Sequence, residues 1–291
     1  MTTVNATYEN TIATFQPVLD AANRGAEGLV MGRHSDASRC LSWALSTVKQ
    51  QLKDVRQKSH LTQLNKQAPE CGDATSMETE MDTSMDEATT DGAIHLSCID
   101  IPVTALPAQD YVLYNQALTV SSSSPAAAHP QEHQMEETAV QALSFVLLHN
   151  LALLHHFQAL QTRECETARR QALLSRAKTL YENTIRLWSS SYIQPPAQDA
   201  DSSHTVTQYA GIWNNLAHVC LLLGEHELAD RCWEEILRVA REDRSQSQHA
   251  SAGTSAGSNA NSQGLGHGSY GIFLENIVHM MCKSHEAAAA A

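Results

Sequence analysis

A glycine-rich stretch holds two motifs that could do chemistry. Residues 253–271 read GTSAGSNANSQGLGHGSYG and contain a G-x-S-x-G around Ser255 and a G-x-G-x-x-G that begins at Gly266. The first presents a serine nucleophile in hydrolases and the second binds dinucleotide phosphates, provided that a strand precedes the motif and a helix follows it. The polar run REDRSQSQHASA precedes the first motif, and no strand pattern precedes the second. We therefore interpret the stretch as a linker and expect no catalytic residue and no cofactor.

The fifteen histidines raise the question of a metal site. Two ligands on one helix should be three or four residues apart, a spacing that His149, His155 and His156 do not have. His129 and His133 have it, but they belong to the proline-containing run AHPQEHQ, without Cys or Asp companions. The seven cysteines are scattered and form no C-x-x-C pair. The sequence therefore predicts no metal site.

The composition and net charge of the chain limit which kinds of molecule it is expected to bind. The formal net charge is −13, and residues 67–92 hold eight acids and no bases, so the rest of the chain carries −5. An acidic balance disfavours nucleic acid as a partner. The N-terminal residues do not resemble a signal peptide, and polar residues interrupt the most apolar run. We therefore expect no membrane contact and an intracellular location, cytoplasmic or nuclear.

Four stretches have compositions that bury too little apolar surface to fold. They are predicted to be disordered: an acidic insert at 67–92 and linkers at 121–136, 189–205 and 244–267. Between the first two, residues 93–120 predict a β-hairpin insert, because Ile94, Leu96 and Cys98 alternate. The second run of that insert, 110–120, could equally start as a helix.

Two blocks of the chain repeat one another without a gap. Residues 18–51 and 211–237 place small residues, a turn glycine (Gly32 and Gly224) and large apolar residues at the same offsets. This pattern resembles the tetratricopeptide repeat (TPR), which implies pairs of antiparallel helices. The resemblance implies a mainly α fold: a short TPR-like α-solenoid in a single domain spanning 1–291. Another helical bundle is the alternative.

The repeats can be assigned along the chain. Residues 18–54 form repeat 1 and residues 206–243 form repeat 3. Repeat 2, residues 137–188, fits the pattern if the turn between its helices is stretched by about a dozen residues around QTRECETARR. Residues 268–284 resemble the first helix of another repeat, and we expect them to form a capping helix over the apolar end of the stack.

One polar residue recurs on the first helix of each predicted repeat. Asn23, Asn150 and Asn215 share an offset, and Asn276 matches it in the capping segment. In TPR proteins this position faces the concave groove, and an amide there can both donate to and accept from the backbone of an extended peptide. These four asparagines are the candidate peptide-binding residues. The alternative is that each asparagine bonds a neighbouring helix and fixes the repeat geometry.

A carboxylate clamp for chaperone C-termini is one known version of this groove. It would require lysines where this sequence has Leu19 and Gly211, and an arginine where it has Asn215. The resemblance therefore argues against a chaperone C-terminus as the ligand.

These observations predict a non-enzymatic protein-interaction scaffold or adaptor that binds a peptide or helix of another protein in its concave groove. Two other classes stay open. One is an enzyme, or its regulatory subunit, with a site between the hairpin insert and the helices. The other is a self-assembling structural protein.

Overall fold

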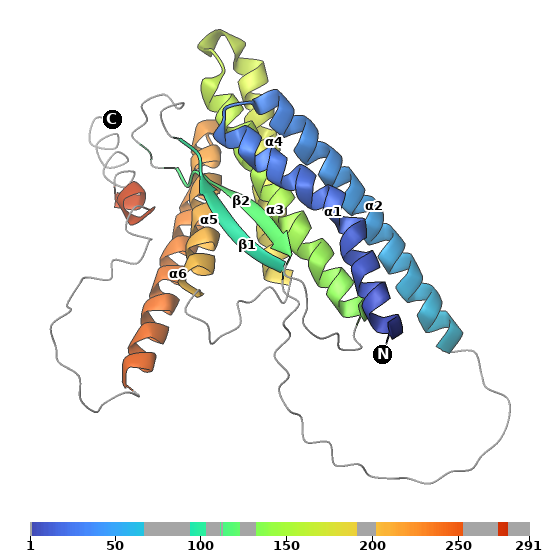
Figure 1. The fold of residues 1–291 in the computed structure, drawn as a ribbon. Coiled ribbons are helices and arrows are strands. Elements are labelled where there is room, and N and C mark those ends of the chain that lie inside the picture. Colours follow the sequence, from blue (N-terminus) through green and yellow to red (C-terminus); the bar gives the residue numbers. More distant parts are fainter. Residues whose placement is uncertain are drawn as a thin grey trace, which may run out of the picture.

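The structure is a computed structural model that describes residues 2–66, 94–102, 111, 113–122, 132–190, 202–252 and 273–278. It is mainly helical (Figure 1). The long helices are α1 (Thr2–Val30), α2 (His34–Lys66), α3 (Glu132–Gln161), α4 (Thr167–Ser190), α5 (Ser202–Leu223) and α6 (His226–Ala252). Two strands, β1 (Ile94–Asp100) and β2 (Gln116–Ser122), and a 3₁₀ turn, η2 (Glu164–Glu166), complete the labelled elements.

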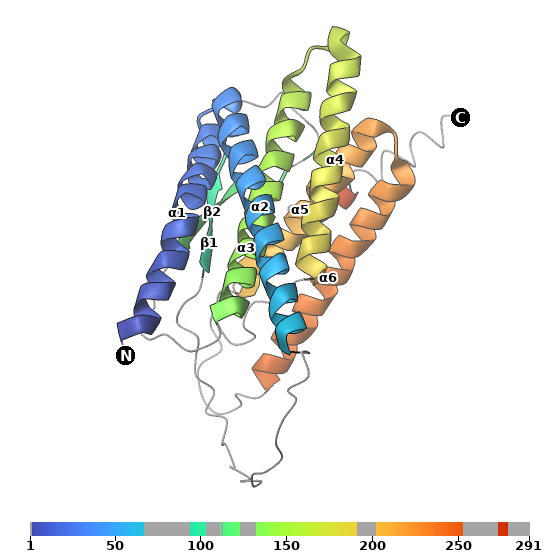
Figure 2. The ribbon, with the colours of Figure 1, turned by 90° about the vertical axis from the view of Figure 1, so that its right-hand side faces the viewer.

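The helices form three pairs, α1 with α2, α3 with α4 and α5 with α6, and each pair packs against the next. Figure 2 shows the helices running side by side, an arrangement compatible with a helical repeat fold. Gly32 and Gly224 end the first helix of their pairs with φ values of 68° and 78°. This left-handed conformation suits glycine because it has no Cβ, so both residues allow the tight reversal between paired helices.

The close approach within the first pair depends on small residues. A Cβ on Gly25 would lie 2.5 Å from the Leu41 side chain, and one on Gly28 would lie 3.2 Å from the Ala37 Cβ. Ala37 and Leu41 are fully buried. The small residues of the repeated blocks therefore let α1 and α2 cross closely, as expected for helical hairpins.

The expected hairpin insert is confirmed as a two-stranded antiparallel sheet. β1 and β2 pair in a register that sets Leu96 opposite Val120 and Cys98 opposite Leu118. The segment before β2 is extended rather than helical in its described residues, 113–115. The sheet lies on the side of α1 and α3 (Figure 1), and Leu118 and Val120 belong to the main hydrophobic core. Contact with the helices therefore supports a hairpin that would be marginal alone.

Some predicted loop boundaries were wrong. The turn of the second pair is short, because α3 ends at Gln161 and η2 leads directly into α4 at Thr167. The inserted residues lengthen the helices instead of the loop. Parts of the predicted linkers are also ordered: 121–122 belong to β2, 132–136 to α3, 189–190 to α4, 202–205 to α5 and 244–252 to α6. Glu, Gln, Arg and Ala extend a helix at little cost, which composition alone does not reveal.

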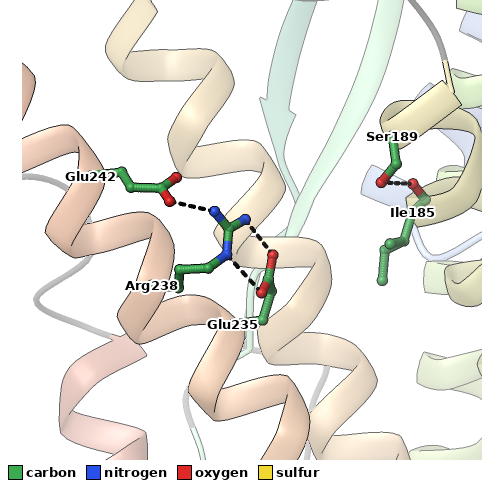
Figure 3. Close-up of polar contacts among 5 residues, drawn as sticks. All are labelled: Ile185, Ser189, Glu235, Arg238 and Glu242. Atoms are coloured by element: carbon green, nitrogen blue, oxygen red, sulfur yellow. Dashed lines mark hydrogen bonds and ion pairs between the residues drawn. The ribbon is translucent and has the colours of Figure 1, made fainter.

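The outer surface of α6 carries charges that pair along the helix. Arg238 contacts Glu235 and Glu242, three and four residues away (Figure 3). Figure 3 also shows the Ser189 hydroxyl donating to the carbonyl of Ile185 near the end of α4. Such exposed pairs contribute little stability, so the fold depends on the apolar faces between the helices.

Candidate functional site

Three of the four predicted asparagines hold an extended segment of the same chain. Asn150 donates from Nδ2 to the carbonyl of Leu118 at 2.7 Å, and its Oδ1 accepts from the Leu118 N–H at 2.9 Å. Asn23 makes the same pair of bonds to Val120, at 2.9 and 3.0 Å. Asn215 does so with Tyr114, at 2.8 and 2.9 Å. We call Asn23, Asn150 and Asn215 the amide row, and residues 113–122 the inner segment.

The amide row stands where another strand would pair with the inner segment. Just beyond the paired strands, Ile101 N–H donates to the Asn115 carbonyl at 2.8 Å, and Asn115 Nδ2 donates to the Ile101 carbonyl at 2.7 Å, so these two residues continue the register as a hydrogen-bonded position. Such pairs alternate with pairs whose main-chain groups point outward. In the inner segment, the residues with even numbers therefore point away from β1. Tyr114, Leu118 and Val120 are even-numbered, and these are the residues that the amide row binds.

The aromatic residues around the start of the inner segment anchor it on α5. A Cβ on Gly211 would lie 2.4–2.7 Å from ring atoms of Tyr114, so only glycine leaves room for this ring. Tyr111 donates to the carbonyl of Asn214 at 2.9 Å and stacks on His218 with ring centroids 4.4 Å apart. Both tyrosines are buried, which raises the pKa of each above its ordinary value. Both hydroxyls are therefore neutral near neutral pH.

In the described part of the chain, Asn276 contacts a side chain of α5. Its Nδ2 donates to Oδ1 of Asn214 at 2.9 Å, and it lies in a helical stretch, residues 273–278. Phe273 in the same stretch meets the Tyr114 ring edge-on, with centroids 6.1 Å apart. The described part of the predicted capping segment thus packs against α5 and the anchor of the inner segment. The rest of 268–284 lies outside the described residues.

A buried network of histidines continues from the amide row. Asn215 Nδ2 also donates to the Tyr181 hydroxyl, at 3.4 Å. His156 Nδ1 lies 3.4 Å from the same hydroxyl, and its Nε2 lies 3.1 Å from Nδ1 of His218, so the two rings share a hydrogen bond. His149 Nε2 lies 3.1 Å from the Gln116 carbonyl, which can only accept, so Nε2 carries the proton.

Burial keeps the three histidines neutral. It lowers the pKa of His149 to about 4, against the opposing effect of the bond to Gln116. It also lowers the pKa of His218 to about 4, with a smaller contribution from the positive charge of Arg170. The pKa of His156 lies well below 6.5, first because of burial and then because of His218. The rings therefore act as hydrogen-bonding core residues near neutral pH.

The histidine network offers little for catalysis or metal binding. His149 and His156 have no exposed surface and His218 is 6% exposed, so a substrate cannot reach them. Within the described ranges, no three His, Cys, Asp or Glu side chains gather as metal ligands do. Ser255 and the motif at Gly266 lie outside the described residues.

Sequence reasoning found the amide row but not its ligand. The asparagines share an offset that the sequence shows, whereas nothing local in the sequence indicates that they bind residues 114–120 of the same chain. In the sequence, Gly211 is notable only for standing where a clamp would need a lysine. Its other role was detectable in principle, because a glycine inside an apolar helical pattern can mark a close approach of another side chain.

One helix in the described part of the chain, Ala139–Gln161, is long and apolar enough to cross a membrane. Of its most apolar window, 78% is buried inside the fold, as in the core helix of a soluble protein. Comparison with known proteins adds no relative: no family model, no curated protein and no solved structure matches the chain.

Proposed function

We propose that the chain is a non-enzymatic protein-interaction scaffold, built as a short TPR-like α-solenoid, whose concave face binds an extended segment of another protein. One observation carries the proposal. The amide row binds an extended segment through its main chain, with two hydrogen bonds per asparagine and at a repeated position on α1, α3 and α5. Hydrogen bonds to the main chain can hold an extended peptide whatever its side chains are.

The inner segment already occupies the amide row, and this limits where a partner can bind. Ala117 and Leu118 of the inner segment have no exposed surface, and Tyr114 is 5% exposed. A partner peptide that replaced them would have to compensate for the loss of this burial and of six hydrogen bonds. Binding over the hairpin requires no such loss. The scaffold therefore meets its partner on the concave face beside the inner segment, with the amide row supporting the hairpin from below.

The test is purification of the tagged full-length chain from native lysate, followed by measurement of complex mass and stoichiometry. The comparison variant is Gly211→Ala, whose Cβ disturbs Tyr114 and loosens the inner segment. We expect a stoichiometric protein partner on the wild-type chain and weaker retention on the variant. Stronger retention would mean that the partner displaces the inner segment. A chain that stays monomeric without a partner would contradict the scaffold function, and a mass that rises with concentration would favour self-assembly.

Replacing the whole amide row is a poor test of this function. An Asn23/Asn150/Asn215→Ala variant removes all six bonds to the inner segment, and Asn150 and Asn215 are fully buried. Loss of a partner from such a variant would report loss of the fold. Gly211→Ala keeps all three asparagines and changes only the contact with Tyr114, so it disturbs the fold less than the triple variant does.

A further inference from the structure

The outer edge of β1 has main-chain groups that point away from β2. The pair formed by Ile101 and Asn115 fixes the alternation, so the odd-numbered residues of β1 face β2 and the even-numbered ones face outward. The outward residues include Leu96, Cys98 and Asp100. Nothing in the described part of the chain makes a hydrogen bond to their N–H or carbonyl groups. The hairpin thus has one edge on the amide row and the other edge open among these residues.

β1 lacks the features by which proteins protect such an edge. Its sequence, IHLSCID, holds no proline and no lysine, and the strand pairs with β2 over seven residues without a bulge. Natural sheets avoid long unprotected edges because these recruit strands from other chains. Ser97 and Asp100 are exposed, and Leu96 and Cys98 are half-buried, so the strand reaches the surface. An edge of this kind suits a strand that arrives from outside.

The net charge of the chain favours one kind of incoming strand at the outer edge of β1. The protein carries −13, and the 26 residues that end just before Ala93 hold eight acids and no bases. A second copy of the chain would carry the same net charge and be repelled. A segment with lysines or arginines would be attracted, and its on-rate would rise.

We propose that an extended, basic segment of a partner protein adds to the outer edge of β1 as a third strand, beside β2. Its main chain bonds the N–H and carbonyl groups of Leu96 and Cys98, as in β-augmentation of other sheets. The inference rests on the scaffold function proposed above and names the binding mode and the charge of the ligand. The rigid support is the amide row, which holds the opposite edge of the hairpin.

The test uses the full-length chain and two dye-labelled octapeptide probes, one of alternating Lys and Val and one of alternating Glu and Val. We expect the Lys peptide to bind at least tenfold more tightly, with an affinity that falls as salt is added. In the Leu96→Pro variant the ring replaces an outward N–H without removing a bond to β2, and we expect at least a tenfold loss of affinity. Leu96→Thr makes a similar side-chain change, keeps the N–H and should bind within threefold of wild type.

A second measurement guards against an effect of proline on folding. In the wild-type chain, amide hydrogen exchange followed by NMR should slow at Leu96 and Cys98 when the Lys peptide is added. The proposal is overturned if these amides are unaffected at saturating peptide, or if Leu96→Pro binds the peptide like wild type. It is also overturned if light scattering shows dimers that Leu96→Pro abolishes, because the edge then pairs with a second copy.

The outcomes separate this inference from the scaffold function. If Leu96→Pro keeps the stoichiometric partner of the wild-type chain, the edge proposal fails and the scaffold stands. If no partner exists while the Lys peptide still binds at the edge, the scaffold function fails and the edge remains a peptide site.

Discussion

The absence of a side chain at Gly211 makes room for a tyrosine ring of the inner segment. The position of Gly211 on α5 lies directly under Tyr114, and the space of a Cβ is taken by the tyrosine ring. In a helix interior, glycine is normally about 1 kcal/mol less favourable than alanine. At this position the packing of the Tyr114 ring against α5 offsets the lower helix propensity of glycine.

We predict that Gly211→Ala destabilises the protein by about 1–3 kcal/mol, since the overlap with Tyr114 outweighs the gain in helix propensity. Urea unfolding followed by circular dichroism measures the change. Gly28→Ala is a graded control, because its Cβ would meet the Ala37 Cβ at 3.2 Å and needs only a small shift. An unchanged or higher stability of Gly211→Ala would show that Tyr114 is not held against α5.

Ion pairs on the surface should matter far less. Arg238 joins Glu235 and Glu242, but its side chain is 49% exposed and that of Glu242 is 57% exposed. Because water screens such charges, we expect Arg238→Ala to change the free energy of unfolding by less than about 1 kcal/mol. Urea unfolding at low and high salt checks this. A loss of several kcal/mol would show that the ion pairs of Arg238 stabilise the fold far more than exposed pairs normally do.

At the scale of elements, the inner segment depends on side chains that replace a neighbouring strand. Asn150 is the central member of the amide row, and its partner Leu118 is fully buried. Its removal leaves a buried main-chain N–H and carbonyl without partners, each at a cost of about 1–3 kcal/mol. Asn23 contacts the end of the segment and is only half-buried.

We therefore predict that Asn150→Ala lowers the free energy of unfolding by about 2–5 kcal/mol and Asn23→Ala by less. Amide exchange should quicken at Leu118 in the first variant and at Val120 in the second. Asn183→Ala, at a half-buried position on α4, is the matched control and should have little effect. Equal effects of Asn150→Ala and Asn183→Ala would mean that the inner segment does not need the amide row.

The elements also show how far sequence reasoning reaches. Repeated small residues and the glycines at 32 and 224 predicted helical hairpins, because steric rules at turns and crossings act locally. Alternation predicted β1 for the same reason. The pairing of Asn215 with Tyr114 spans 101 residues, and no local rule links them. The helix ends at Gln161 and Ala252 were missed because tertiary context, rather than composition, decides where polar helical turns stop.

At the scale of the whole molecule, buried neutral histidines make stability depend on pH. The pKa values of His149 and His218 are about 4 in the folded state, against about 6.5 when unfolded. Between these values the unfolded chain binds more protons, so the free energy of unfolding falls as pH falls. Stability is full above pH 6.5 and is lost progressively towards pH 4.

We predict a loss of roughly 3 kcal/mol for each of these two histidines by pH 4, enough to unfold a domain of ordinary stability. Urea unfolding at several pH values between 7.5 and 4.5 measures the slope. His149→Gln keeps a donor for the Gln116 carbonyl but does not titrate, so it should flatten the slope. If the slope is unchanged in this variant, His149 does not contribute to the pH dependence of the free energy of unfolding.

The inner segment has a consequence for the order in which the chain becomes structured. Residues 113–122 precede α3 to α6 in the sequence, yet two of their three amide partners, Asn150 and Asn215, lie on α3 and α5. During synthesis the hairpin leaves the ribosome before most of its binding surface exists. In a simple repeat array, each helix pair can fold as soon as it has been synthesised. In this protein the apolar inner segment lacks part of its binding surface until α5 has been synthesised. Synthesis of α5 is therefore the step that completes the binding surface of the inner segment and joins it to all three helix pairs.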